Sequence, residues 1–352
     1  MELSGRASGF QLNFVTHTIS VKKLTMRFLV ATFSLLFLTQ NALSQTISAA
    51  DKKKLQVKED SLKSLAEYLI TDSSTASRMI SDSLFVRTLI RSLQIKNSFY
   101  HPFDSVIGIS KLYAPDTSFR IFTWVIEFDE YYSRQRGAIQ FRTPDGSLKL
   151  IPLRDYSEFT ENPMDSVRTK NNWIGAVYYN IIKTKHSGKN YYTLFGYDNN
   201  SAMSSKKWIE VMTFNEKKEP VFGGQYFTFN EDSIPKPPQH RFSIEYKKKA
   251  RTLVNYVPDL DLILVDHLIS ETDEPENKWT LVPDGDYEGF KWENGKWVHV
   301  DKVFTFKLKD GEAPIIDPIL DKKGNEDEKK LQERSDKNKN KGKERIPINY
   351  DN

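Results

Sequence analysis

Arg120-Ile121-Phe122-Thr123-Trp124-Val125-Ile126-Glu127-Phe128 alternates in side-chain character, with large apolar residues at the even positions from Phe122 onward. Successive side chains of a β-strand point to opposite faces, so a period of two predicts a strand with one face on a core. Arg241-Phe242-Ser243-Ile244-Glu245-Tyr246 repeats the pattern with polar residues at the odd positions. These two stretches indicate a body built from β-strands.

Further segments with strand character surround these two, and they are separated by residues that favour tight turns, such as Pro144-Asp145-Gly146 and Glu293-Asn294-Gly295. The segments are residues 138–142, 148–153, 173–183, 191–197, 208–214, 225–229, 260–268 and 303–308. They do not alternate with helices, as the strands of a parallel α/β sheet would. We therefore predict an antiparallel β-rich domain over residues 101–308, and leave open whether it is a sandwich, a barrel or a curved meander.

Residues 45–100 have the period of helices instead. In residues 51–70 the apolar positions are Leu55, Leu62, Leu65, Ala66 and Leu69. In residues 76–94 they are Met79, Ile80, Leu84, Phe85, Leu89, Ile90 and Leu93. Both patterns predict amphipathic helices that pair and cover part of the β-domain. The fold class expected is thus mainly β with two N-terminal helices, α+β overall. A partner-binding coil is the alternative, although the stripe does not keep a 3.5-residue repeat.

The chain begins with a segment typical of export. Basic residues precede the apolar run 28–38, whose 11 residues are too few to span ~30 Å of hydrocarbon as a helix. Such a run has the length of a signal-peptide core, and Met26-Arg27 would form a compact start for it. The alternative is an N-terminal anchor that stays attached.

A cleavage site follows this run. Ala42 and Ser44 are small residues at the −3 and −1 positions, which predicts cleavage between Ser44 and Gln45 and a signal peptide over residues 1–44. The mature chain would hold 47 basic and 46 acidic residues, and this balance argues against a nucleic-acid binder. We expect a periplasmic, outer-envelope or secreted protein without a transmembrane span after cleavage.

No cysteine occurs in the 352 residues, which excludes disulfides, thiolate metal sites and a thiol nucleophile. The C-terminal segment differs from the rest in composition, because residues 309–352 hold 11 basic and 11 acidic groups and one aromatic residue, Tyr350. Such a segment buries too little apolar area to offset its ordering entropy. We predict that residues 309–352 are a disordered charged tail.

The motifs of the common catalytic sites are missing, so we assign no catalytic, cofactor-binding or metal-binding residue and predict no cofactor. Asp266-His267 on one strand would point to opposite faces. Two oxygen-rich turns, Asp198-Asn199-Asn200-Ser201 and Asp284-Gly285-Asp286, fall short of a calcium-binding loop. Acidic residues that could pair only in the fold, as in a glycoside hydrolase, are Asp129, Glu130, Asp155, Glu210, Asp259 and Asp261.

The segment 284–297 holds two aromatic stretches joined by Glu293-Asn294-Gly295-Lys296, a pattern that predicts a hairpin and is similar to one copy of a membrane-occupation repeat. Tyr287, Trp292 and Trp297 would either form an exposed platform for stacking sugar rings or close the core. We favour core packing and keep the platform as a hypothesis.

Residues 119–124, 173–180, 191–198 and 282–285 resemble an uncharacterised family of exported proteins from Bacteroidota-type bacteria, over about residues 60–305. The resemblance implies export and a single body, and it transfers no catalytic residue. We therefore expect a non-catalytic binding or structural module of the cell envelope, with an envelope protein or a glycan as partner. The alternative is a carbohydrate-active or other hydrolase whose acidic pair forms only in the fold.

Overall fold

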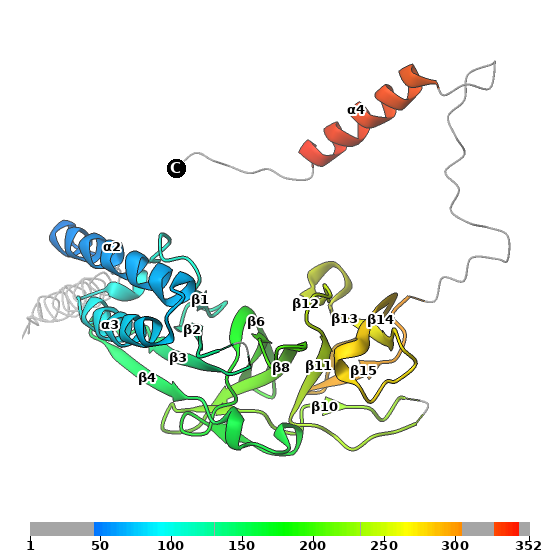
Figure 1. Ribbon diagram of the computed structural model, residues 1–352, viewed down its shortest axis with the longest axis horizontal. Coiled ribbons are helices and arrows are strands. Elements are labelled where there is room, and N and C mark those ends of the chain that lie inside the picture. Colours follow the sequence, from blue (N-terminus) through cyan, green and yellow to red (C-terminus); the bar gives the residue numbers. More distant parts are fainter. Residues whose placement is uncertain (1–45, 130, 233, 305–326, 345–352) are drawn as a thin grey trace, which may run out of the picture. The chain divides into compact units, whose positions relative to one another are not determined.

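The computed structural model describes residues 46–129, 131–232, 234–304 and 327–344 (Figure 1). The chain divides into two units, the first ending at Val303 and the second beginning at Phe304. The predicted signal peptide, its start at Met26 and the bond between Ser44 and Gln45 lie outside the described residues, as does most of the strand predicted for residues 303–308.

Within the second unit the structure has a helix, α4 (Glu328–Glu344), inside the segment predicted to be disordered. Its described side chains, residues 328–337, are all exposed, so no burial of apolar surface stabilises it. Disorder of the whole segment 309–352 stays a prediction.

Antiparallel pairing dominates the first unit, which confirms the mainly β, α+β fold class. Its strands form a four-stranded sheet in the order β1-β2-β3-β4, a five-stranded sheet in the order β10-β15-β14-β13-β12, and a six-stranded sheet in the order β5-β9-β8-β7-β6 with β11 also paired to β8. Among the described strands, only β10 and β15 pair in parallel.

Most predicted segments contain a strand, although β3 and β6 are shifted, and the short strands β1, β5, β9 and β12 lie outside the predicted segments. The four-stranded sheet, which we call sheet one, comprises β1 (Ser110–Tyr113), β2 (Phe119–Glu127), β3 (Ser133–Phe141) and β4 (Lys149–Arg154). The six-stranded sheet comprises β5 (Arg168–Thr169), β6 (Val177–His186), β7 (Lys189–Asp198), β8 (Ser204–Phe214), β9 (Pro220–Phe222) and β11 (Arg241–Lys247). The five-stranded sheet comprises β10 (Phe227–Thr228), β12 (Val254–Val257), β13 (Leu262–Ser270), β14 (Leu281–Glu293) and β15 (Lys296–Val300).

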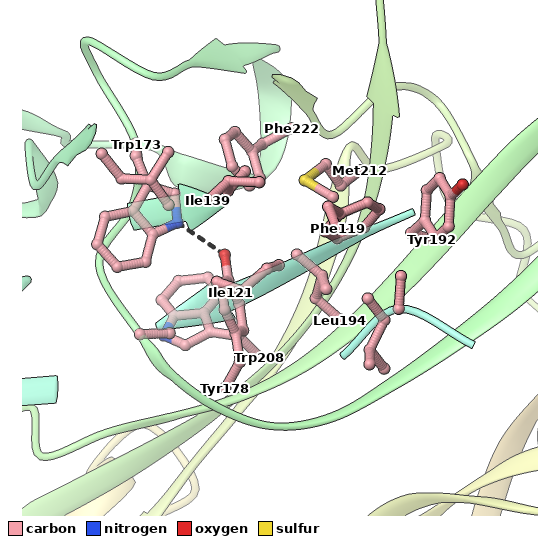
Figure 2. Packing of buried hydrophobic residues seen from close by; sticks show 14 of the residues in the cluster. Phe119, Ile121, Ile139, Trp173, Tyr178, Tyr192, Leu194, Trp208, Met212 and Phe222 are labelled. Atoms are coloured by element: carbon pink, nitrogen blue, oxygen red, sulfur yellow. Dashed lines mark hydrogen bonds between the residues drawn. The ribbon is translucent and has the colours of Figure 1, made fainter. Parts of the chain in front are cut away.

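The six-stranded sheet is the middle layer and is buried on both faces. Along β7, Tyr192 and Leu194 pack against sheet one, whereas Tyr191 and Phe195 pack against the five-stranded sheet. β8 alternates in the same way, because side chains on a strand point to opposite faces. Figure 2 shows the core between the six-stranded sheet and sheet one, where Trp173 donates a hydrogen bond from Nε1 to the hydroxyl of Tyr178, 2.7 Å away.

Helices α2 (Ala49–Thr71) and α3 (Thr75–Leu93) lie beside sheet one (Figure 1). Ser48 and Ser74 cap their N-termini through side-chain oxygens. The apolar face of each helix packs on Phe122, Trp124 and Ile126 of β2. Strand β2 is therefore buried on both faces, and the prediction of one core face was incomplete.

The apolar stripe of α3 is only partly buried. Phe85, Leu89 and Leu93 are in the core, whereas Met79, Ile80, Leu84 and Ile90 are exposed. The stripe is wider than the contact that one helix makes with a sheet, so its outer side is left uncovered. Among the described residues, no helix is both long and apolar enough to cross a membrane.

Candidate functional site

The predicted aromatic hairpin is formed by β14 and β15, and its tryptophans belong mainly to the core. Trp292 and Trp297 are directly opposed across the hairpin, with ring centroids 5.1 Å apart. Trp297 is fully buried and donates from Nε1 to Oγ1 of Thr193, at 3.0 Å. Tyr287 and Trp292 are half-buried, and their odd and even positions on one strand direct them to opposite faces. The three rings therefore do not form one exposed platform.

Two of the acidic candidates, Glu210 and Asp155, are engaged in structural contacts. Glu210 is buried against Arg241 and Tyr178. Asp155 accepts from the backbone N–H groups of Gln135 and Ser157, each at 2.9 Å. Their burial and hydrogen bonds account for their positions without a catalytic role.

The remaining acids lie apart from these. Asp261 accepts a hydrogen bond from the hydroxyl of Tyr256 at 2.6 Å, and Asp259 is exposed in the preceding 3₁₀ turn, Pro258–Leu260. Asp266 and His267 point to different surroundings, since Asp266 is buried against the backbone of Leu253 and His267 is exposed. Glu130 lies outside the described residues.

The turn Asp198-Asn199-Asn200-Ser201 binds an ammonium group of the protein itself. The Nζ of Lys248 donates to the backbone oxygen of Asn199 at 2.5 Å, to its Oδ1 at 2.6 Å and to the backbone oxygen of Ser201 at 2.8 Å. The ammonium group of Lys248 thus occupies the position that a metal ion bound by these turn oxygens would take. In the other turn, Asp284 pairs with His267. The described residues contain no cluster of three or more acidic or histidine side chains suited to a metal ion.

Four exposed aromatic residues lie at another place, where two short segments meet at the end of sheet one. Tyr131 and Tyr132 lie in the turn between β2 and β3. Phe159 lies in the 3₁₀ turn Ser157–Phe159 that follows β4, and Tyr156 directly precedes this turn. We call these four residues the aromatic surface. The exposed fractions are 74% for Tyr131, 36% for Tyr132, 42% for Tyr156 and 62% for Phe159.

Local hydrogen bonds hold both segments in shape. Oδ1 of Asp129 accepts the backbone N–H groups of Tyr131 and Tyr132, each at 2.7 Å, which closes the turn and presents both rings outward. Asp155 begins the second segment in the same way through the backbone N–H of Ser157. Each segment thus begins with an aspartate whose side chain binds the backbone just before or at the exposed rings.

A side-chain hydrogen bond joins the two segments. The hydroxyl of Tyr132 donates to Oε2 of Glu158, 3.1 Å away. The rings of Tyr156 and Phe159 lie 4.9 Å apart between centroids, and those of Phe128 and Tyr132 lie 5.0 Å apart. Partial burial and the Glu158 carboxylate raise the pKa of Tyr132, so its phenol stays a hydrogen-bond donor at neutral pH. The result is two pairs of rings, one at each segment, linked by the hydrogen bond between Tyr132 and the exposed Glu158.

Sequence reasoning missed this surface because its members come from two segments more than twenty residues apart. The Tyr131-Tyr132 pair in a polar turn was the available signal. Comparison of the chain with models of protein families, with curated proteins and with solved structures finds no match.

Proposed function

We propose that the protein is a non-catalytic binding module of the bacterial cell envelope and that it binds a glycan on the aromatic surface. The observation that carries the proposal is the exposure of the four rings on two segments that the hydrogen bond between Tyr132 and Glu158 joins. The C–H faces of a sugar ring are apolar and stack on aromatic side chains, while its hydroxyl groups need hydrogen-bond partners nearby. Tyr132 and Glu158 supply such partners.

The charge of the surface favours a neutral glycan over an anionic lipid surface. Asp129 and Glu158 are exposed beside the rings, and the nearby Arg134 is half-buried and donates to the backbone oxygen of Asp155 at 3.2 Å. Anionic headgroups attract clusters of lysine and arginine, which this surface lacks. An uncharged saccharide meets no such repulsion.

The envelope location rests on the sequence. The basic residues, the 11-residue apolar run and the small residues before Gln45 predict export, and the resemblance to exported bacterial proteins agrees with it. Fractionation of cells that produce the full chain, with N-terminal sequencing of the mature protein, tests this part. A protein recovered from the cytosol with residue 30 intact would contradict it.

The glycan proposal is tested by binding to defined polysaccharides. The probes are a soluble β-glucan, a xylan and a galactomannan in native affinity gels, and purified peptidoglycan sacculi in co-sedimentation. We expect retardation or co-sedimentation with at least one probe. Replacing Tyr156 and Phe159 together by alanine should weaken that binding about tenfold, because two stacking contacts are lost.

Tyr68→Ala is the matched control, because Tyr68 is also an exposed aromatic residue, 58% exposed on α2. It should leave binding unchanged. If no probe binds, or if the Tyr156/Phe159 variant and the control bind equally, the proposal is wrong. Release of reducing ends from a bound polysaccharide would instead favour the hydrolase alternative.

A further inference from the structure

A second feature of the first unit is a cleft of about 430 Å³ between α3 and the outer strands of sheet one. This volume lies within the range of small-molecule sites. Its apolar walls are Val86 and Ile90 of α3, Trp124 of β2, Ala138 of β3, and Leu150 and Pro152 of β4. It shares no residue with the aromatic surface. We call it the α3–β4 cleft.

The register of sheet one explains why the cleft exists. Phe122, Ala138 and Pro152 are opposed in one row across β2, β3 and β4. α2 and α3 cover the β2 end of this row, and the small side chain of Ala138 leaves space beside it. The β3 and β4 end of the same face therefore remains open to solvent, with apolar side chains at its base.

The next row places two positive charges side by side. Trp124, Arg136 and Arg154 are opposed across the same three strands, and all three line the cleft. Like charges at directly opposed positions of an antiparallel pair are unfavourable. Arg87 of α3 adds a third guanidinium to the lining. An anion bound between Arg136 and Arg154 would remove this repulsion.

The cleft holds one carboxylate, and it does not neutralise the three arginines. Asp82 is buried and accepts from Nε1 of Trp124 at 3.0 Å and from a guanidinium nitrogen of Arg136 at 3.2 Å. The side chain of Arg136 is still 50% exposed. Within the described part of the chain, neither Arg87 nor Arg154 makes a side-chain hydrogen bond or an ion pair. The lining carries a net charge of about +2 at neutral pH.

The two ends of the cleft differ in chemistry. Along β4, Leu150 lies four residues before Arg154, which at the rise of a strand is roughly 13 Å. Along α3, Ile90 lies eight residues after Asp82, roughly 12 Å at the rise of a helix. One end thus has the guanidinium groups of Arg136 and Arg154, and apolar side chains line the cleft from it for about the length of an extended decyl chain, with Arg87 of α3 between the two ends.

We propose that the α3–β4 cleft binds a small amphipathic carboxylate, with the carboxylate between Arg136 and Arg154 and an unbranched alkyl chain along Val86, Ile90, Leu150 and Pro152. Guanidinium groups match the planar carboxylate through paired N–H donors. The alkyl chain removes exposed apolar surface of α3 and β4 from water. This site does not depend on the glycan proposal.

The test is calorimetric titration of the folded full chain with decanoate below its micelle concentration. Acetate carries the charge without the chain, and decyltrimethylammonium carries the chain with the opposite charge. We expect decanoate to bind and both controls to bind at least about tenfold more weakly. Equal binding of decyltrimethylammonium, or no binding of decanoate, would overturn the proposal. Binding of a glutamate-rich peptide in place of decanoate would also overturn it, in favour of a protein partner.

Arg154→Gln removes a guanidinium that has no partner in the described residues, so the variant should fold normally. We expect it to weaken decanoate binding about tenfold. Ala138→Leu fills the base of the cleft and should abolish binding, with thermal melting as the check on folding. Arg91→Gln is the matched control, since Arg91 is exposed on α3 outside the cleft. If R154Q binds decanoate as tightly as R91Q does, the assignment is wrong.

Discussion

His299 and Asp232 lie 67 residues apart in the sequence, yet Nδ1 of the imidazole is 2.7 Å from a carboxylate oxygen of Asp232. The other ring nitrogen of His299 lies 3.1 Å from Oε2 of Glu288. The His299 side chain is only 3% exposed. Burial alone would lower the pKa of His299, but the hydrogen bonds to Glu288 and Asp232 and their charges outweigh it and raise the pKa above its usual value of 6.5.

This arrangement predicts a pH-dependent stability. A group whose pKa is raised in the folded state contributes fully below its unfolded-state pKa, and the contribution is lost as the pH rises through the folded-state value. The wild type should therefore lose stability between pH 6 and pH 9, and His299→Gln should lose about 2 kcal/mol at pH 6 and less at pH 9. Urea unfolding at both pH values measures this. His267→Gln, at an exposed ion pair, should change stability by less than about 1 kcal/mol. Equal losses for H299Q at both pH values would refute the prediction.

The buried ion pair of Glu210 and Arg241 predicts a large loss of stability when one partner is removed. Nε of Arg241 lies 3.3 Å from the Glu210 carboxylate, and both side chains are at most 3% exposed. Glu210→Ala leaves a buried cation without its counter-charge and should cost about 4 kcal/mol in the free energy of unfolding. Tyr178→Phe, which removes only the hydroxyl bonded to Glu210 and Trp173, should cost about 1 kcal/mol. Chemical denaturation of both variants measures the two losses in the free energy of unfolding. A larger loss for Y178F than for E210A would contradict the prediction.

Arg120 is fully buried without a carboxylate among its hydrogen-bond partners. Its donors reach the side chains of Gln140 and Tyr113 and the backbone oxygens of Ser98 and His101, at 2.6 to 2.9 Å. Burial lowers its pKa to about 10, so it remains charged at neutral pH.

Arg120→Lys should therefore be destabilising although the charge is kept. Lysine lacks the planar fork that reaches four acceptors at once, and we expect a loss of about 2 kcal/mol. Thermal and urea unfolding give the value. Arg142→Lys, at an exposed position, is the control and should be close to neutral. A near-neutral R120K would show that the fork geometry is unimportant here.

Lys248 predicts the response of the protein to calcium. Its ammonium group already binds three oxygens of the turn at Asn199 and Ser201. Burial lowers the pKa of Lys248, and the negative charges of Glu127 and Asp198 offset this in part. Adding millimolar calcium to the wild type should leave the melting temperature unchanged, whereas Lys248→Met should lower stability by about 2 kcal/mol, because the three oxygens lose their donor. A calcium-dependent rise in the melting temperature of the wild type would count against this assignment.

The strands and helices were predictable because each depends on local periodicity. The alternation in β2 and β11 and the apolar spacing of α2 predicted the correct element type, since burial of one face imposes the same period on the sequence. The burial of Arg120 was not predictable, because a charged residue in a strand usually faces water. It is inside because the loop after α3 brings backbone oxygens and aromatic rings to it.

The candidate sites were less predictable, because each depends on which segments meet. The tryptophans of the β14–β15 hairpin suggested a sugar platform, yet the neighbouring sheet covers Trp297. The exposed rings instead come from segments such as those of Tyr131 and Phe159, which the hydrogen bond between Tyr132 and Glu158 joins.

By itself, the sequence determined the antiparallel β character, the two helices and the absence of any disulfide, since these follow from side-chain period and composition. The tertiary structure alone decided that the middle sheet is buried on both faces, that Lys248 occupies the oxygen-rich turn, and that Arg136 and Arg154 are adjacent in an open cleft. The physical reason is the range of the interactions: a period is repeated within a few residues, whereas burial and charge proximity depend on partners tens of residues away.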